Sequence, residues 1–84
     1  MTEKHKHILN RIFKQPVSAN VEWSEAFSLL DSLGAKVEEI DDSQFFASLN
    51  GVLLCQHRLD SDSVMTKFAV TNLRDFLIRC GVHP

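Results

Sequence analysis

Residues 41–58 read DDSQFFASLNGVLLCQHR, and the Asn50-Gly51 pair near their centre predicts a β-hairpin. A two-residue type I′ turn needs positive φ at both central positions, which asparagine and glycine tolerate best. With that turn, the register pairs Leu49 with Val52, Ala47 with Leu54, Phe45 with Gln56 and Gln44 with His57. His57 is the only histidine away from the two ends of the chain, and the register sets it opposite Gln44 at the open end of the hairpin. This pair is the first candidate functional position.

The two faces of the hairpin differ in composition. Because side chains alternate along a strand, one face carries only apolar residues, and we expect it to pack against helices: Phe45, Ala47, Leu49, Val52 and Leu54. The opposite face mixes apolar Phe46, Leu53 and Cys55 with Gln44, Ser48 and His57. An uncovered sheet face is usually polar. The apolar residues on this face therefore predict either a covering segment or an interface, with a partner or with a second copy.

The rest of the chain predicts three helices and one further strand. Apolar residues at helical spacing indicate helices over about residues 3–14, 24–33 and 67–80, with Ser24 as the N-cap of the second and Gly34 after its end. A strand is expected over about 35–40, before the hairpin strands 44–49 and 52–57. The predicted fold is a single α+β domain over 1–84 with the order α-α-β-β-β-α, in which helices cover one face of a three-stranded antiparallel sheet. The pattern leaves open whether the helix within residues 1–15 packs on the core or is peripheral.

Composition and charge limit the function classes. The 84 residues contain no apolar run long enough to cross a bilayer and open with MTEKHKH, so a cytoplasmic protein without a membrane role is expected. Cys55 and Cys80 have no CxxC or Cys/His spacing, which predicts reduced, mostly buried thiols and neither a metal nor another cofactor. The net charge is −2, but residues 1–20 carry +3 and the last 22 carry +2, so a basic patch forms if the two ends lie together.

Four segments together resemble the HicA family, the toxins of bacterial type II toxin–antitoxin pairs. These are PVSANVEWSEAFSLLDSLGA, the LNGV turn, the His57-Arg58 pair after the third strand, and FAVTNLRDFLIRCGV. The similarity runs from about Ile8 to Val82. It implies a fold like that of a double-stranded-RNA-binding domain. It also implies an mRNA interferase, an endoribonuclease that acts on mRNA and is neutralised by a HicB-type antitoxin.

The resemblance also places a catalytic position and shows a departure from the family. The active histidine of the family sits in a Gly-Ser-His motif that opens the second strand, and the matching positions here are Asp42, Ser43 and Gln44. Glutamine has no proton to transfer near neutral pH, whereas histidine titrates there. His57, across the hairpin from Gln44, is the candidate replacement as acid or base. Basic residues are expected to hold RNA phosphates: Arg58, Lys67 and Arg74.

Three functions remain open. The first is a HicA-like toxin that cleaves mRNA through His57. The second is a non-catalytic member of the fold that binds RNA or an antitoxin. The third sets the resemblance aside and gives an interaction domain that pairs, as a homodimer or with another protein, through Phe46, Leu53 and Cys55.

Overall fold

The elements of the fold follow the predicted order. The computed structural model describes residues 3–16, 21–41, 44–57 and 64–84. Its elements are α1 (Glu3–Ile12), α2 (Trp23–Ser32), β1 (Lys36–Glu39), β2 (Gln44–Leu49), β3 (Val52–His57) and α3 (Lys67–Arg79). The strands form one antiparallel sheet in the order β1-β2-β3. The α+β fold with the order α-α-β-β-β-α is thereby confirmed.

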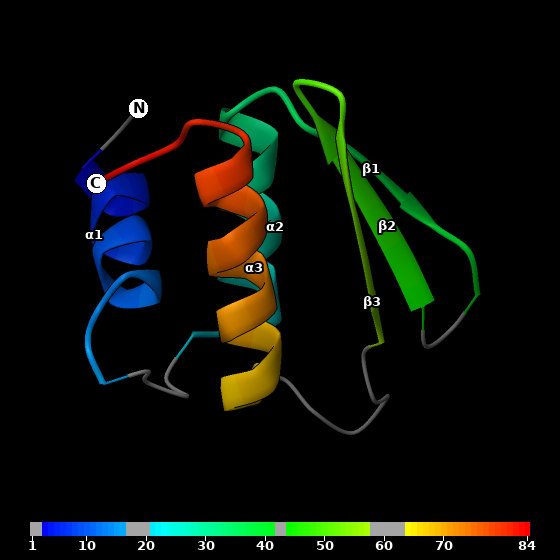
Figure 1. The fold of residues 1–84 in the computed structure, drawn as a ribbon. Coiled ribbons are helices and arrows are strands. Elements are labelled where there is room, and N and C mark those ends of the chain that lie inside the picture. The colour runs from blue at the N-terminus through cyan, green and yellow to red at the C-terminus, as the bar shows by residue number, and fades with distance from the viewer. Residues whose placement is uncertain (1–2, 17–20, 42–43, 58–63) are drawn as a thin grey trace.

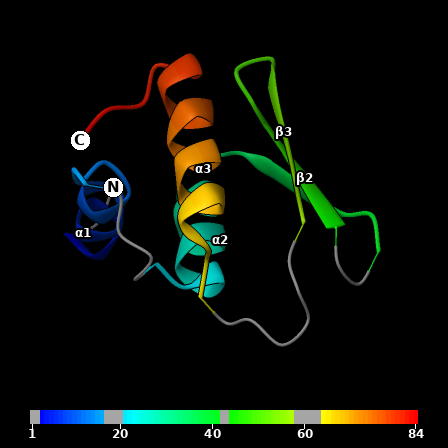
Figure 2. The same ribbon diagram turned by 60° about the horizontal axis from the view of Figure 1, so that its bottom comes forward.

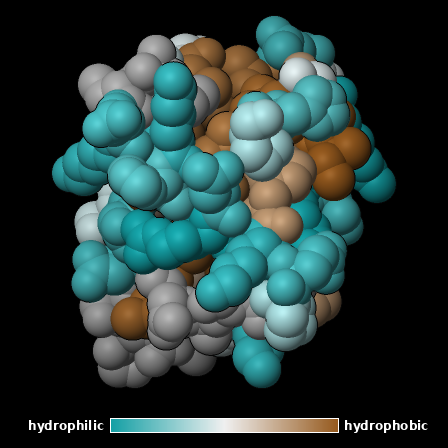
Figure 3. Space-filling model, turned by 90° about the vertical axis from the view of Figure 1, so that its left-hand side faces the viewer, coloured by the Kyte–Doolittle hydropathy of each residue, from teal (hydrophilic) through white to brown (hydrophobic). Residues whose placement is uncertain are grey.

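The elements form three layers. Figures 1 and 2 show the sheet, then α2 and α3 side by side, and then α1 on the far side of these two helices. α1 is part of the core, because Ile8, Leu9 and Ile12 are each at most 2% exposed. The outward side of the molecule at α1 is covered mainly by hydrophilic side chains (Figure 3), and the exposed residues of this helix include Lys4 and Lys6.

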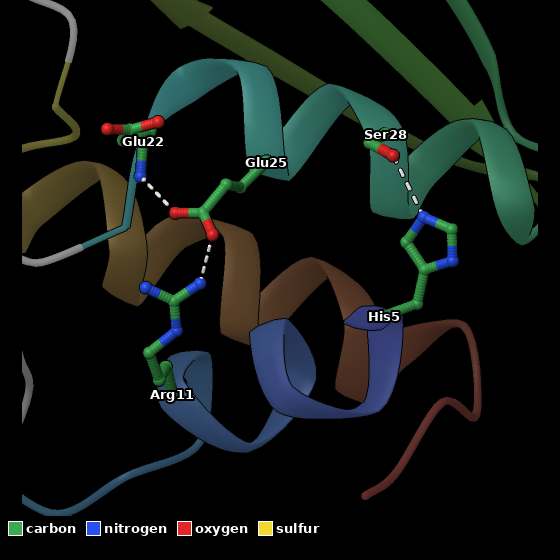
Figure 4. A network of polar contacts seen from close by, with 5 residues as sticks. All are labelled: His5, Arg11, Glu22, Glu25 and Ser28. Carbon is green, nitrogen blue, oxygen red and sulfur yellow. Dashed lines mark hydrogen bonds and ion pairs between the residues drawn. The ribbon is translucent and has the colours of Figure 1, made fainter. Parts of the chain in front are cut away.

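Polar contacts fix α1 against α2 (Figure 4). Arg11 donates to the Glu25 carboxylate in an ion pair, and a His5 ring nitrogen lies 2.8 Å from the Ser28 hydroxyl oxygen. The other carboxylate oxygen of Glu25 accepts the backbone N–H of Glu22 at 3.1 Å. Partial burial acts to raise the pKa of Glu25, but the Arg11 guanidinium and the Glu22 N–H outweigh it, so the pKa lies below its ordinary value.

Glu25→Gln is expected to lower the free energy of unfolding by about 0.5–1 kcal/mol at neutral pH, because both partners of the ion pair are partly exposed. A lowered pKa means that the folded chain holds this proton less tightly than the unfolded chain does. Glu25 therefore stabilises the fold above the ordinary carboxylate pKa, and that contribution is lost as the pH falls through its folded pKa. Urea unfolding at several pH values checks this. A difference between wild type and Glu25→Gln that stays constant into acid would contradict it.

The start of α2 differs from the prediction. The N-cap is Glu22 rather than Ser24, and Trp23 begins the helix. A capping box between Glu22 and Glu25 closes the start of the helix, and a distant segment pairs with the residues before it: the Met65 N–H donates to the Val21 carbonyl at 2.8 Å, and Glu22 bridges to Val64. This pairing holds residues 21 and 22 extended, so the chain turns into the helix directly after them.

The hairpin has the predicted turn and register. Asn50 has φ 53° and Gly51 φ 81°, the positive values that a type I′ turn requires. All four predicted pairs are present: Leu49 with Val52, Ala47 with Leu54, Phe45 with Gln56 and Gln44 with His57. The Asn50 side-chain amide donates to the Cys80 carbonyl at 2.9 Å, which ties the turn to the end of α3.

The predicted inner face of the hairpin joins the core. Phe45, Ala47 and Leu54 are each at most 9% exposed, and Leu49 and Val52 pack partly buried beside them. The Phe45 ring meets Trp23 and Phe27 of α2 edge to face, with centroids 5.7 Å and 4.9 Å apart. Such pairs add about 0.5–1.5 kcal/mol to the burial of the rings themselves. The inner face therefore fixes the sheet on the helix layer and leaves the other face outward.

Candidate functional site

The outward face of the sheet carries an apolar group that no helix covers. All three helices lie on the opposite side of the sheet (Figures 1 and 2). Leu53 is 65% exposed, Cys55 is exposed and Phe46 is half-buried. Phe46 and Cys55 are directly paired across the strands, and Leu53 pairs with Ser48. The sequence predicted this apolar face, and the described residues place no segment over it.

The two positions proposed for acid–base chemistry are paired at the open end of the hairpin. Gln44 opens β2, and the register sets His57, the last residue of β3, opposite it. The backbone N–H of Gln44 donates to the Asp41 carboxylate at 2.9 Å, and its carbonyl accepts from Ile40 at 2.9 Å. These bonds tie the first residue of β2 to the chain just after β1. Ser43, the third predicted residue of this group, lies outside the described residues.

Two of the three predicted phosphate-binding residues lie among the described residues, and both belong to α3. Lys67 is exposed and is the first residue of α3. Arg74 is two turns further along and half-buried, and its Nη1 is buried with no hydrogen-bond partner among the described residues. Arg58 lies outside the described residues. Lys67 is at the same end of the molecule as Gln44 and His57, because Gln56 contacts α3 at Ala69.

The buried glutamine in β3 is the functional candidate that the sequence reasoning missed. Gln56 is 6% exposed, and its Nε2 donates to the Ala69 carbonyl of α3 at 3.0 Å. Its Oε1 is buried with no hydrogen-bond partner among the described residues. A buried acceptor without a donor is costly, so its presence needs an explanation. The sequence does contain a signal for it. Side chains alternate along a strand, so position 56 lies on the same face as Val52 and Leu54, and a polar side chain there interrupts an apolar series.

The two cysteines lie in different environments. Both are free thiols, and Cys80 is buried as predicted, with its Sγ donating to the Leu49 carbonyl at 3.2 Å. The prediction of a buried thiol is wrong for Cys55, which is exposed on a face of the sheet that none of the described segments covers. Burial raises the pKa of the Cys80 thiol and so lowers its thiolate fraction near neutral pH.

We expect the native chain to show one fast thiol and one slow thiol toward a chromogenic disulfide reagent at pH 8. Cys55 reacts as an open thiol, whereas Cys80 must first be exposed by local opening, so its reaction is at least about tenfold slower. Cys55→Ser removes the fast phase and leaves the slow one. Equal rates for both thiols, or a fast phase that survives Cys55→Ser, would contradict this assignment.

The described residues were compared with the requirements of a metal site and of a membrane-spanning helix, and they meet neither. Among the described residues, no three His, Cys, Asp or Glu side chains gather where they could hold a metal ion. In the same part of the chain, every helix is too short or too polar to cross a membrane.

The chain matches no protein-family model, no curated protein and no solved structure. Its function must therefore be inferred from its own residues and from their arrangement.

Proposed function

We propose that the chain is a HicA-like toxin, an endoribonuclease that cleaves mRNA and is neutralised by a HicB-type antitoxin. The observation that carries the proposal is the hairpin register. Gln44, at the position of the family's active histidine, pairs with His57, the last residue of β3. A histidine is therefore available across the ladder from the place where the family keeps one. The order α-α-β-β-β-α also agrees with the fold that the resemblance implies.

In this proposal His57 acts as the general base. It takes the proton of a ribose 2′-hydroxyl, the 2′ oxygen attacks the adjacent phosphorus, and the P–O5′ bond breaks. The leaving 5′ oxygen then takes a proton from the imidazolium, and a cyclic phosphate remains on the other fragment. Histidine suits both steps because it titrates near neutral pH. Gln44 donates a hydrogen bond to a ribose or phosphate oxygen, and Arg58 and Lys67 contact flanking phosphates.

Two further features accord with the proposal. Lys67 is exposed at the same end of the molecule as the Gln44–His57 pair, so it is within the path of an RNA strand that crosses that end. The two free thiols accord with the reducing cytoplasm, where such a toxin would meet mRNA. Arg74, being half-buried, is the weakest of the three proposed phosphate contacts.

Induced expression in a bacterium tests the proposal. Wild type is expected to arrest growth and His57→Ala to abolish the arrest, because the base is lost. His83→Ala, which removes an exposed histidine near the C-terminus, is the matched control and is expected to arrest growth like wild type. Soluble wild-type protein that does not slow growth would contradict the proposed toxin activity in that host. A neighbouring reading frame for a HicB-like protein that restores growth would support it.

A second candidate function is favoured by the glutamine at position 44 and by the uncovered sheet face. If hydrolysis was lost with the family histidine, the chain is a binding module for RNA or for an antitoxin. In that case, purified wild type shifts a single-stranded RNA on a native gel without cutting it, and His57→Ala binds as well as wild type. Size-exclusion of wild type and Phe46→Ser then tells whether the outward face pairs two copies.

A further inference from the structure

One edge of the sheet has unpaired backbone groups along β3. β3 is an outer strand, and its two-residue turn makes Leu49 and Val52 a hydrogen-bonded pair. The N–H and C=O groups of Leu53 and Cys55 consequently point away from β2. In the described part of the chain, no other strand pairs with this edge. The edge therefore offers a ladder of donors and acceptors to an extended backbone.

The two edges of the sheet differ in charge. β1, at the other edge, reads KVEE, and its Lys36 and Glu38 form an ion pair at 3.1 Å. Charged side chains on an edge strand discourage pairing with another chain. β3 reads VLLCQH and contains no Asp, Glu, Lys or Arg. The protection that β1 has against strand addition is thus missing at β3.

A groove runs between this edge and α3. A hollow of about 260 Å³ is lined by Leu53 and Cys55 on one side and by Asn72, Asp75 and Arg79 on the other. A second hollow of about 140 Å³ shares Cys55 and Asn72 with it and extends to Gln56 and Phe68. From Phe68 to Arg79, α3 is about 16 Å long, which is the length of five to six extended residues. The groove therefore has the length of one added strand.

The side chains along the groove define the occupant. Phe68 is 76% exposed and offers an apolar contact near the start of α3, where it lines the same hollow as Gln56. Gln56 contacts α3 near its start, and Asn50 contacts Cys80 at its end, so β3 and α3 run in opposite directions. A strand antiparallel to β3 would therefore begin near Gln56 and end near Arg79, an exposed residue whose positive charge favours a carboxylate.

We propose that this groove binds an extended protein segment of about six residues. The segment adds to the sheet as a fourth strand, antiparallel to β3. It presents an apolar side chain to Phe68 and a carboxylate, from a side chain or a C-terminus, to Arg79. The groove lies at the edge of β3, so the proposal does not depend on RNA cleavage at the Gln44–His57 pair. A second copy is a poorer occupant, because it would have to place its own α3 where the first copy's α3 already borders the edge.

The probe for this proposal is a library of random linear hexapeptides displayed on phage, selected against the full chain. Enriched peptides are synthesised, and their Kd is measured by fluorescence anisotropy. We expect an acidic residue or a free C-terminus at the Arg79 end, and Arg79→Glu is expected to weaken binding at least about fivefold. Leu53→Lys, which places a charge on the edge, is expected to weaken it similarly. Glu38→Ala on β1 is the matched control and leaves the Kd within about twofold.

Backbone methylation of the peptide gives a readout that side-chain contacts alone would not produce. In an added strand, alternate N–H groups point toward β3 and the others point away. N-methylation at successive positions should therefore alternate between a loss of about tenfold and little change. No enriched peptide, or methylation losses that do not alternate, would overturn the proposal. A wild-type dimer in sedimentation that Leu53→Lys dissociates would overturn it too, because the edge would then belong to a second copy.

Discussion

Leu54→Ala is expected to lower the free energy of unfolding by about 2–4 kcal/mol. Leu54 is 9% exposed on the face of β3 that packs on the helices, and its strand partner Ala47 is fully buried. The substitution removes buried methyl groups and leaves a cavity at a place where the sheet meets the helix layer. A domain of 84 residues is marginally stable, so a loss of this size unfolds a large part of the population on mild warming.

Leu53→Ala is the matched control for that prediction. It makes the same chemical change one residue earlier in the same strand, but Leu53 is 65% exposed on the outward face. The expected change is within about 0.5 kcal/mol. Urea unfolding followed by the fluorescence of Trp23, the only tryptophan, measures both variants. Equal losses for the two variants would mean that a covering layer buries the outward face in solution.

The hairpin was predictable because its determinants are local. Asn50 and Gly51 select the turn, the turn determines the register, and alternation assigns each side chain to a face. These steps separate Leu53 from Phe45, and the apolar composition of the Phe45 face then predicts that this face is the buried one. The pairing of Gln44 with His57 follows from the same three steps.

The features that sequence reasoning missed depend on contacts between distant segments. Ser24 was predicted as the N-cap, but Glu22 has that role, in a capping box with Glu25 and in a bridge to Val64 that nothing near residue 24 indicates. The burial of Arg74 depends on what packs against α3, which a helical pattern does not specify. The groove also depends on a contact between distant segments, because residues of β3 form one of its sides and residues of α3 form the other.

If the chain is the endoribonuclease proposed above, Gln44→His is expected to raise the rate of RNA cleavage by about 10²-fold or more. The substitution places a histidine at the start of β2, where the proposed function puts the active histidine, opposite His57 in the register. Two histidines at paired positions of neighbouring strands can each carry out one proton transfer: one takes the 2′ proton, and the other protonates the leaving oxygen. A single histidine must do both steps in turn. Gln44 is half-buried on the outward side of the sheet, so an imidazole of similar size fits without disturbing the core.

Two further variants show whether position 44 itself carries this gain. Gln44→Asn keeps an amide and shortens it, so it is expected to cleave no faster than wild type. Gln44→His combined with His57→Ala is expected to lose most of the gain, because the two imidazoles act together and their effects are not additive. Cleavage of a fluorogenic RNA by the four purified proteins measures this directly. A Gln44→His rate equal to that of wild type would place the chemistry elsewhere. An undiminished gain in the double variant would show that the introduced histidine acts without His57, which would then have no catalytic part in the Gln44→His variant.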